Sequence, residues 1–169
     1  MHLLCVVSLF VALVPGPQAA ASKAQTPAPK PAAKAAPAAA TGKGRTVELT
    51  GGDDMKFNLT TITAKPGETI RVVLKSVGTI PKIAMAHNFV VLNLGADATE
   101  FIKAAANAQA TDYVPADQKA KILAATKLAG PSESVEVSFK VPAKAGSYPY
   151  LCSFPGHYAA GMKGQLVVK

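Results

Sequence analysis

One short segment, residues 150–164, concentrates the side chains of this sequence that are able to do chemistry. It reads YLCSFPGHYAAGMKG and places Cys152, His157 and Met162 five residues apart, with a proline and glycines between them. A thiol, an imidazole and a thioether can form a nucleophile with its base, can bind a soft metal ion, or can be ordinary packing side chains. The proline and glycines allow the segment to turn back toward a single point, so we expect a loop between two strands.

A fourth candidate, His87, comes from a distant part of the chain. Outside the first 44 residues, which contain His2 and Cys5, the sequence has one cysteine and two histidines. Taken singly, a buried cysteine or methionine is usually a core side chain. Taken together, two imidazoles, a thiolate and a thioether are typical of a copper centre with three strong ligands and a weak axial methionine, which carries single electrons. The sequence predicts one copper ion with the ligands His87, Cys152, His157 and Met162.

Two other classes of function compete with this interpretation. A Cys–His nucleophilic pair would require a third group that orients the histidine, and Met162 would have no part in it. A copper oxidase or nitrite reductase would need further histidines, one of them beside the cysteine, where Leu151 and Ser153 stand. We therefore expect that the protein is not an enzyme. A copper-binding protein for delivery or buffering remains the alternative, although the open His-rich, Met-rich or C-x-x-C runs of such carriers are missing.

The elements that must position these residues are short strands. Between Thr46 and Lys169 the sequence contains seven or eight runs that alternate or are rich in β-branched residues, separated by turn signals such as the Pro-Gly pair in residues 65–68. The clearest is residues 134–141, SVEVSFKV, where every second side chain is apolar. This pattern predicts an all-β sandwich or barrel of about eight strands.

Residues 97–125 break the strand pattern. They are rich in Ala, Lys and Gln, and we expect a helical insertion that is interrupted near residues 113–115. Asp97 and Asp112 are suitable residues to begin helices, and Pro115 suits a first helical turn. The insertion would leave the two-layered core to the strands.

The first 44 residues have a different composition. Residues 1–21 contain an apolar run that is too short to span a bilayer, followed by small residues, which is typical of a secretory signal peptide or of an uncleaved anchor. Residues 22–44 are rich in Ala, Pro and Lys and are expected to form a disordered linker. The predicted organisation is a signal at 1–21, a linker at 22–44 and one folded domain at 45–169, in an exported, periplasmic protein that is either free or tethered to a membrane.

The net charge of +8 does not indicate a nucleic-acid-binding protein. From Arg45 onward the chain has 14 basic and 10 acidic residues, a net charge of +4. These charges are scattered, whereas a phosphate-binding surface concentrates Lys and Arg in one stripe. We therefore expect no nucleic-acid partner.

Three stretches of the chain resemble the cupredoxins, and among them most closely the azurin group. They are MAHNFVVL around His87, DYVPADQKAKILAATKLAGPSESVEVSF at residues 112–139, and YLCSFPGHYAAGMKGQLVV at the C-terminal end. The resemblance extends from Arg45 to Lys169 and implies a Greek-key sandwich that holds one type 1 blue copper ion. It also implies a function in electron transport, with transfer of single electrons between Cu(I) and Cu(II).

The resemblance implies a role for each residue of the site. His87, Cys152 and His157 would be equatorial ligands, Met162 would be axial, and the backbone carbonyl of Ala86 would face copper from the opposite side. Asn88 would bond to the ligand loop at Ser153 and help to hold the thiolate.

The family also implies how electrons enter and leave. The edge of His157 would reach the surface inside a small apolar docking patch, formed by Met85, Phe154, Pro155, Ala159 and Ala160. Redox proteins such as c-type cytochromes, oxidases or reductases would bind there transiently, because weak redox encounters bury little area. We expect a monomer.

Three departures from the azurin pattern concern the site and its support. Four residues, rather than three, separate His157 from Met162, as in plastocyanin and auracyanin. Alanine replaces glycine at position 86. The disulfide near the N-terminus of azurin is absent, because the domain has no second cysteine.

Overall fold

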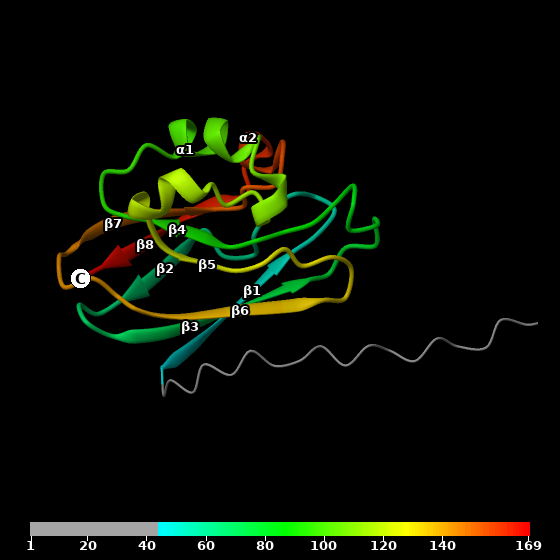
Figure 1. Ribbon diagram of the computed structural model, residues 1–169. Helices are drawn as coiled ribbons and strands as arrows, with labels where there is room; N and C mark the ends of the chain where they lie inside the picture. The colour runs from blue at the N-terminus through cyan, green and yellow to red at the C-terminus, as the bar shows by residue number, and fades with distance from the viewer. Residues whose placement is uncertain (1–43) are drawn as a thin grey trace, which may run out of the picture. The chain divides into compact units, whose positions relative to one another are not determined.

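The computed structural model describes residues 44–169 (Figure 1). The expected signal segment 1–21 and the linker up to residue 43 lie outside the described residues. The elements are β1 (Arg45–Gly51), β2 (Thr61–Ala64), β3 (Thr69–Ser76), β4 (Val90–Leu92), α1 (Ala98–Ala105), the 3-10 turns η1 (Gln109–Thr111) and η2 (Ala116–Lys121), β5 (Ile122–Ala125), β6 (Ser134–Lys140), β7 (Gly146–Leu151), α2 (His157–Ala160) and β8 (Lys163–Val168). In the part of the chain from residue 44 onward, no helix combines the length and the apolar character that crossing a membrane requires.

The strands form two sheets that pack face to face, so the predicted β-sandwich is confirmed (Figure 1). One sheet has the order β1-β3-β6 and the other has the order β2-β8-β7-β4-β5. β1 pairs with β3 and β2 pairs with β8 in parallel, while the other neighbours are antiparallel. The sheets remain separate rather than closing into a barrel.

The main core lies between the two sheets. In β3 the residues Ile70, Val72 and Leu74 alternate with partly exposed neighbours and are fully buried, as the period of a half-buried strand requires. Burying one such side chain contributes about 1.5–3 kcal/mol. From the opposite sheet Tyr150 packs between Phe57 and Phe89, with ring centroids 5.7 and 5.2 Å away. This aromatic cluster supports the strand that leads to Cys152.

A smaller core lies on the outer face of the second sheet, beneath the helical insertion. Val90, Leu92 and Leu151 pack there against Phe101 and Ala105 of α1. Figure 1 shows α1 and the short helical turns above β4, β7 and β5. The insertion therefore covers the two strands that carry ligands at their ends.

The insertion differs in detail from the expectation of helix up to residue 125. Asp97 does begin a helix, because its carboxylate accepts hydrogen bonds from the amides of Thr99 and Glu100 at 2.8 and 3.1 Å. Asp112 does not: it ends η1 in the left-handed conformation (φ 56°). The helical part ends at Lys121, and residues 122–125 form β5, which pairs with β4. Pairing with a neighbouring strand overrides the weak helical preference of the sequence ILAA.

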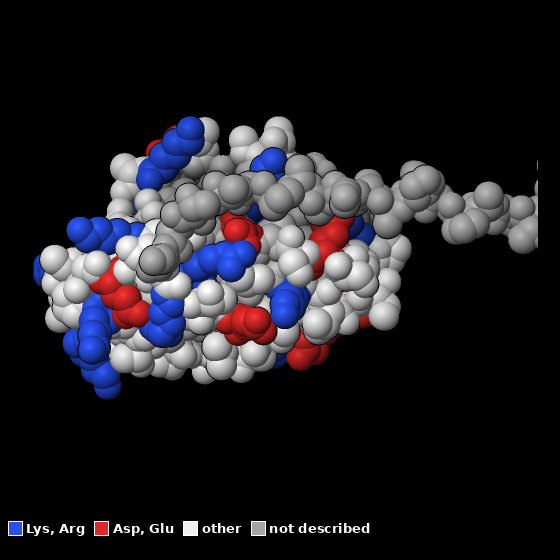
Figure 2. Space-filling model, turned by 90° about the horizontal axis from the view of Figure 1, so that it is seen from below, with Lys and Arg blue, Asp and Glu red and all other residues white. Residues whose placement is uncertain are grey.

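Charged side chains of both signs are mixed on the surface. Figure 2 shows Lys and Arg next to Asp and Glu across the face that it displays. Several of these residues are paired, for example Arg45 with Glu68 at 2.8 Å and Lys82 with Glu133 at 2.6 Å. A surface of mixed sign does not concentrate counterions as a phosphate-binding stripe does.

Candidate metal centre

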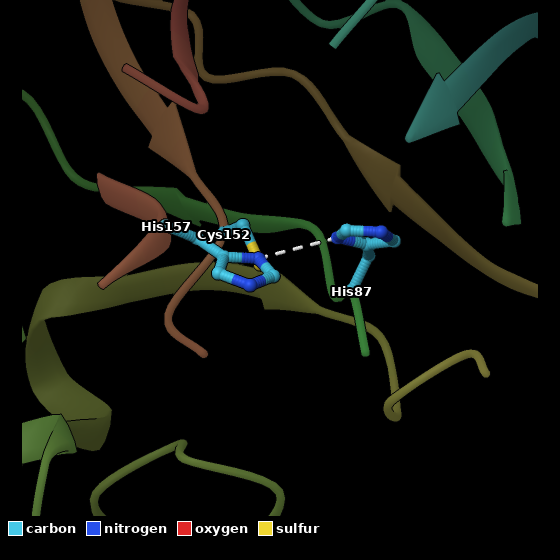
Figure 3. Close-up of side chains that lie close together, drawn as sticks. All are labelled: His87, Cys152 and His157. Atoms are coloured by element: carbon cyan, nitrogen blue, oxygen red, sulfur yellow. Dashed lines mark hydrogen bonds between the residues drawn. The ribbon is translucent and has the colours of Figure 1, made fainter. Parts of the chain in front are cut away.

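Three of the four predicted ligands converge at one end of the sandwich. Nδ1 of His87 lies 3.2 Å from Nδ1 of His157, and Sγ of Cys152 lies 3.4 Å from the same nitrogen of His157 (Figure 3). All candidate ligand atoms of the three residues fall within 4.8 Å of one another, and all three residues are buried. The structure therefore brings together residues that are up to 70 positions apart in the sequence.

Backbone pairing places each of the three side chains. His87 exchanges two hydrogen bonds with Ala129, at 2.9 and 2.8 Å, just before β4 begins. Cys152 directly follows β7, and its amide donates to the carbonyl of Met162 at 3.0 Å. His157 is the first residue of α2. Strand ends and a single helical turn, rather than long loops, thus determine where the imidazoles and the thiol point.

The fourth predicted ligand, Met162, is buried beside the other three. Its amide donates to the carbonyl of His157 at 2.9 Å, which closes the ligand loop. A side-chain carbon added at Gly51 would lie 2.5 Å from Cε of Met162 and 3.1 Å from Cγ of His87. The thioether end of Met162 and the ring of His87 are therefore neighbours, and both approach the end of β1 closely.

Ala86 is also at the site. It is fully buried, and its carbonyl oxygen lies 4.0 Å from Sγ of Cys152. The backbone carbonyl expected to face the metal thus borders the same cluster of donor atoms.

Asn88 connects three segments around the cysteine. Its Oδ1 accepts a hydrogen bond from the amide of Ser153 at 2.8 Å, and its Nδ2 donates to Oγ of Ser153 at 2.8 Å. The same Nδ2 also donates to the carbonyl of Asp112 at 2.9 Å. The link from Asn88 to Ser153 agrees with the expectation and fixes the residue that follows Cys152. The link to Asp112 joins the helical insertion to the site.

Burial keeps the donor groups neutral. Burial raises the pKa of the Cys152 thiol to about 12, against hydrogen bonding by nearby backbone amides. Burial, with the neighbouring His87, lowers the pKa of His157 to about 4. Burial also lowers the pKa of His87, although Asp53 and Asp54 oppose this. Neutral imidazoles are the form that binds metals, and a cation next to the thiol would favour its thiolate.

The donor set fits a small, soft to borderline metal ion. Metal–imidazole distances are about 2.0–2.1 Å, so one ion can contact both Nδ1 atoms across the observed 3.2 Å. Nε2 of His87 is buried and has no hydrogen-bond partner, which leaves Nδ1 as the ring atom of His87 that faces other donors. Two imidazoles, a thiol and a thioether are the combination that copper electron-transfer sites use.

The expected docking residues surround the same end of the molecule with unequal exposure. Pro155 and Ala159 are exposed, and Met85, Phe154 and Ala160 are half-buried. His157, whose edge was expected at the surface, is only 2% exposed. The ring of Phe154 packs on it, with centroids 4.8 Å apart.

Two residues near the site were not identified from the sequence. Ile83, two residues before Met85 in the chain, is an apolar side chain that is 90% exposed. Gly51 gives Met162 the space that it occupies. The only signal for Gly51 was a glycine at the end of a strand, where a close approach of another group is common.

Known proteins that this chain resembles bind copper. Residues 44–169 match the family described as copper binding proteins, plastocyanin/azurin family. The chain is 38% identical to auracyanin-A of Chloroflexus aurantiacus over 119 residues, which cover 69% of each protein. It is 37% identical to azurin of Pseudomonas denitrificans over 126 residues, 73% of this chain and 97% of that azurin. Dithionite-reduced auracyanin of Roseiflexus castenholzii superposes with a TM-score of 0.67 at 37% identity, covering 76% of this chain and 99% of that one.

Proposed function

Since this chain belongs to the plastocyanin/azurin family of copper-binding proteins, we propose that it is a small blue copper protein that shuttles single electrons between other redox proteins. The observation that carries the proposal is the convergence of two imidazole nitrogens and one thiol sulfur in a buried site, within 4.8 Å of one another. We propose electron transfer alone, without a catalysed reaction.

Each residue of the site has a role in this proposal. His87, Cys152 and His157 would hold copper through two imidazole nitrogens and a thiolate, and the thioether of Met162 would be a weaker fourth ligand. The carbonyl of Ala86, which borders the same cluster, would face the ion. Copper at this site would supply a one-electron couple between Cu(I) and Cu(II).

The rest of the chain keeps this geometry constant. Electron transfer makes and breaks no bonds at the protein, so a site that rearranges little loses little energy to reorganisation. His87 is fixed by its paired backbone bonds to Ala129, and Cys152 is fixed by β7 and by the contacts between Asn88 and Ser153. Such outer contacts orient ligands and tune the properties of a metal.

Electrons enter and leave through the apolar end of the molecule. His157 lies just below this surface, under Phe154, which is half-buried. The docking patch of Met85, Phe154, Pro155, Ala159 and Ala160 suits a redox protein that presents its own apolar patch. Contacts of this kind are small and brief, which permits fast turnover of partners such as c-type cytochromes, oxidases or reductases.

We further propose that the protein works after export, in the periplasm, as a monomer. Residues 1–21 have the form of a signal peptide or anchor, and residues 22–44 have the composition of a linker. With an uncleaved anchor, the linker would allow the copper domain to move between partners near a membrane.

The alternative, copper delivery or buffering, is a poorer fit to the site. Transfer of copper between proteins needs ligands that a second protein can reach. Cys152, His87 and Met162 have no exposed surface, and His157 is 2% exposed. Burial of this kind favours retention of the ion.

The test is the visible absorption spectrum of the purified protein after addition of Cu(II). Thiolate-to-copper charge transfer should give an intense blue colour that is bleached by a mild reductant and restored by an oxidant. Cys152→Ser is the matched control, because it exchanges a single atom, the sulfur, for oxygen. A pale wild-type spectrum, or equal colour in the serine variant, would refute the proposed ligation. Rapid loss of bound copper to a chelator would favour delivery.

A further inference from the structure

The carbonyl at the end of α2 has a partner from a distant segment. The last carbonyls of a helix lack donors within the helix. In α2 the carbonyls of His157 and Tyr158 accept from the amides of Met162 and Gly161, at 2.9 and 3.0 Å. The carbonyl of Ala160 instead accepts a hydrogen bond from Nζ of Lys56.

Gly161 provides the space for this contact. It has a positive φ of 100°, which ends the helix and turns the chain toward Met162. A side-chain carbon at this position would lie 2.5 Å from Nζ of Lys56. Both the backbone conformation and the approach of the lysine therefore depend on a residue without a side chain.

Lys56 is carried by a closed loop between β1 and β2. Gly51 and Phe57 form an isolated β-bridge across it. At its base the amide of Thr50 donates to Oδ1 of Asn58 at 2.8 Å, and the amide of Asn58 donates to the carbonyl of Thr50 at 3.2 Å. The loop is thus anchored on β1 and can act as a fixed support.

The same loop contacts the ligand turn at a second point. Gly51 lies against the methyl group of Met162, while Lys56 holds the carbonyl two residues before Met162. Methionine is an unbranched and flexible side chain, so the position of its sulfur depends on how firmly its backbone is held.

We propose that Lys56 is a positioning residue for the axial ligand: its ammonium group holds the turn at residues 160–162 and thereby determines how Met162 approaches the metal. This inference rests on the proposed function for its consequence at copper. The contact between Lys56 and the carbonyl of Ala160, here called the clamp, exists in the chain without metal. Lys56 is exposed, and single exposed contacts contribute little to global stability. The effect should therefore appear in the turn and at the metal.

The clamp can be tested without metal, on the whole purified apoprotein, by amide hydrogen exchange. In Lys56→Met the amides of Ala160 and Met162 should exchange roughly tenfold faster, as loss of a hydrogen bond from a charged donor predicts. The amide of Gln165 donates to the carbonyl of Thr60, just before β2, at 2.9 Å. Its exchange rate should stay unchanged. Lys163→Met is the charge-matched control, because it also removes one positive charge. The side chain of Lys163 lies over the ring of Tyr158, so this substitution leaves the bond between Lys56 and Ala160 in place.

Lys56→Arg should restore slow exchange, since it returns a cationic donor to the same carbonyl. Equal exchange rates in wild-type protein and Lys56→Met would overturn the proposal. Equal acceleration by Lys56→Met and Lys163→Met would also overturn it, since net charge alone would then be responsible.

The second readout is the copper-loaded protein. The reduction potential of such a copper centre responds to its axial ligand, and the thiolate-to-copper absorption is recorded beside it. Both should shift in Lys56→Met relative to Lys163→Met, with a higher potential because a more distant thioether stabilises Cu(II) less. Identical spectra and potentials in the two variants would refute the link from the turn to the metal. A colourless wild-type protein would refute the proposed function instead, and the exchange rates would still decide on the clamp.

Discussion

Replacing Gly51 with alanine tests the contact between β1 and the methionine of the site. The added methyl carbon would lie 2.5 Å from Cε of Met162. Carbon atoms pack well at about 3.5–4.0 Å, so the methyl group of Met162 would have to withdraw by about 1 Å. The end of a methionine side chain can move this far, which means that the fold should survive while the thioether is displaced.

The energy of this change has two opposing parts. Excess volume in a packed interior costs about 1–3 kcal/mol. Replacing glycine by alanine also restricts the unfolded chain, which stabilises the protein by about 0.4–1 kcal/mol. Gly52→Ala is the matched control on the next residue, because its methyl carbon would meet nothing closer than 3.3 Å, at Oδ1 of Asp54. We expect Gly51→Ala to be less stable than Gly52→Ala by about 1–3 kcal/mol.

Urea denaturation of the two apoproteins measures this difference in the free energy of unfolding. The visible spectrum of the copper-loaded proteins gives an independent reading, since only Gly51→Ala should change the thiolate-to-copper absorption. If both variants unfold at the same urea concentration and give the wild-type spectrum, the close approach of Gly51 to Met162 is wrong.

Three further changes test other contacts. Asn88→Ala removes the buried link to Ser153 and should lower the free energy of unfolding by about 2–4 kcal/mol, since each lost hydrogen bond costs about 1 kcal/mol and the partners stay buried. Thermal or urea unfolding of the apoprotein measures this loss. A loss within error of zero would contradict the hydrogen bonds between Asn88 and Ser153. Tyr150→Phe removes a 2.6 Å hydrogen bond to a backbone carbonyl and should cost about 1 kcal/mol without altering the copper spectrum. The pKa of Glu133 lies below its ordinary 4.5, chiefly because of its bond to Lys82. The contribution of Glu133 to the free energy of unfolding is therefore present above pH 4.5 and is lost as pH falls through the folded pKa. The stability of Glu133→Gln should fall less steeply than that of the wild type in this acid range.

The sequence allowed the fold and the candidate ligands to be predicted because both leave strong local patterns. Alternating residues such as those of 134–141 predict which face of a strand is buried. Phe139 and Val141 do lie in the main core and Val135 and Val137 pack against it, although the residues between the two valines and Phe139 are half-buried as well. His87, Cys152 and His157 were found because the domain has so few histidines and cysteines. Met162 was found because it follows His157 in the same short loop. The link between Asn88 and Ser153 was expected only from the resemblance to known proteins, since side-chain hydrogen bonds leave no periodic signal.

Features that depend on contacts between distant segments were missed. β5 is four residues long and alanine-rich, and only its pairing with β4 makes it a strand. The buried position of His157 depends on the ring of Phe154, whose orientation follows from packing. Lys56 meets a residue 104 positions later, and a lysine in a polar loop is indistinguishable in the sequence from a solvated one.

The pairing of β2 with β8 has a consequence for the order of folding. Thr61 is opposite Gln165 in a parallel pair, so this edge of the second sheet closes only when segments from both ends of the domain meet. Topologies dominated by such distant pairings fold slowly, in milliseconds to seconds. His87 and the ligand loop lie in different parts of this topology, and they come together only when it is complete. The colour of the copper-loaded protein should therefore disappear and return together with the whole domain, which makes it an optical reporter of global refolding.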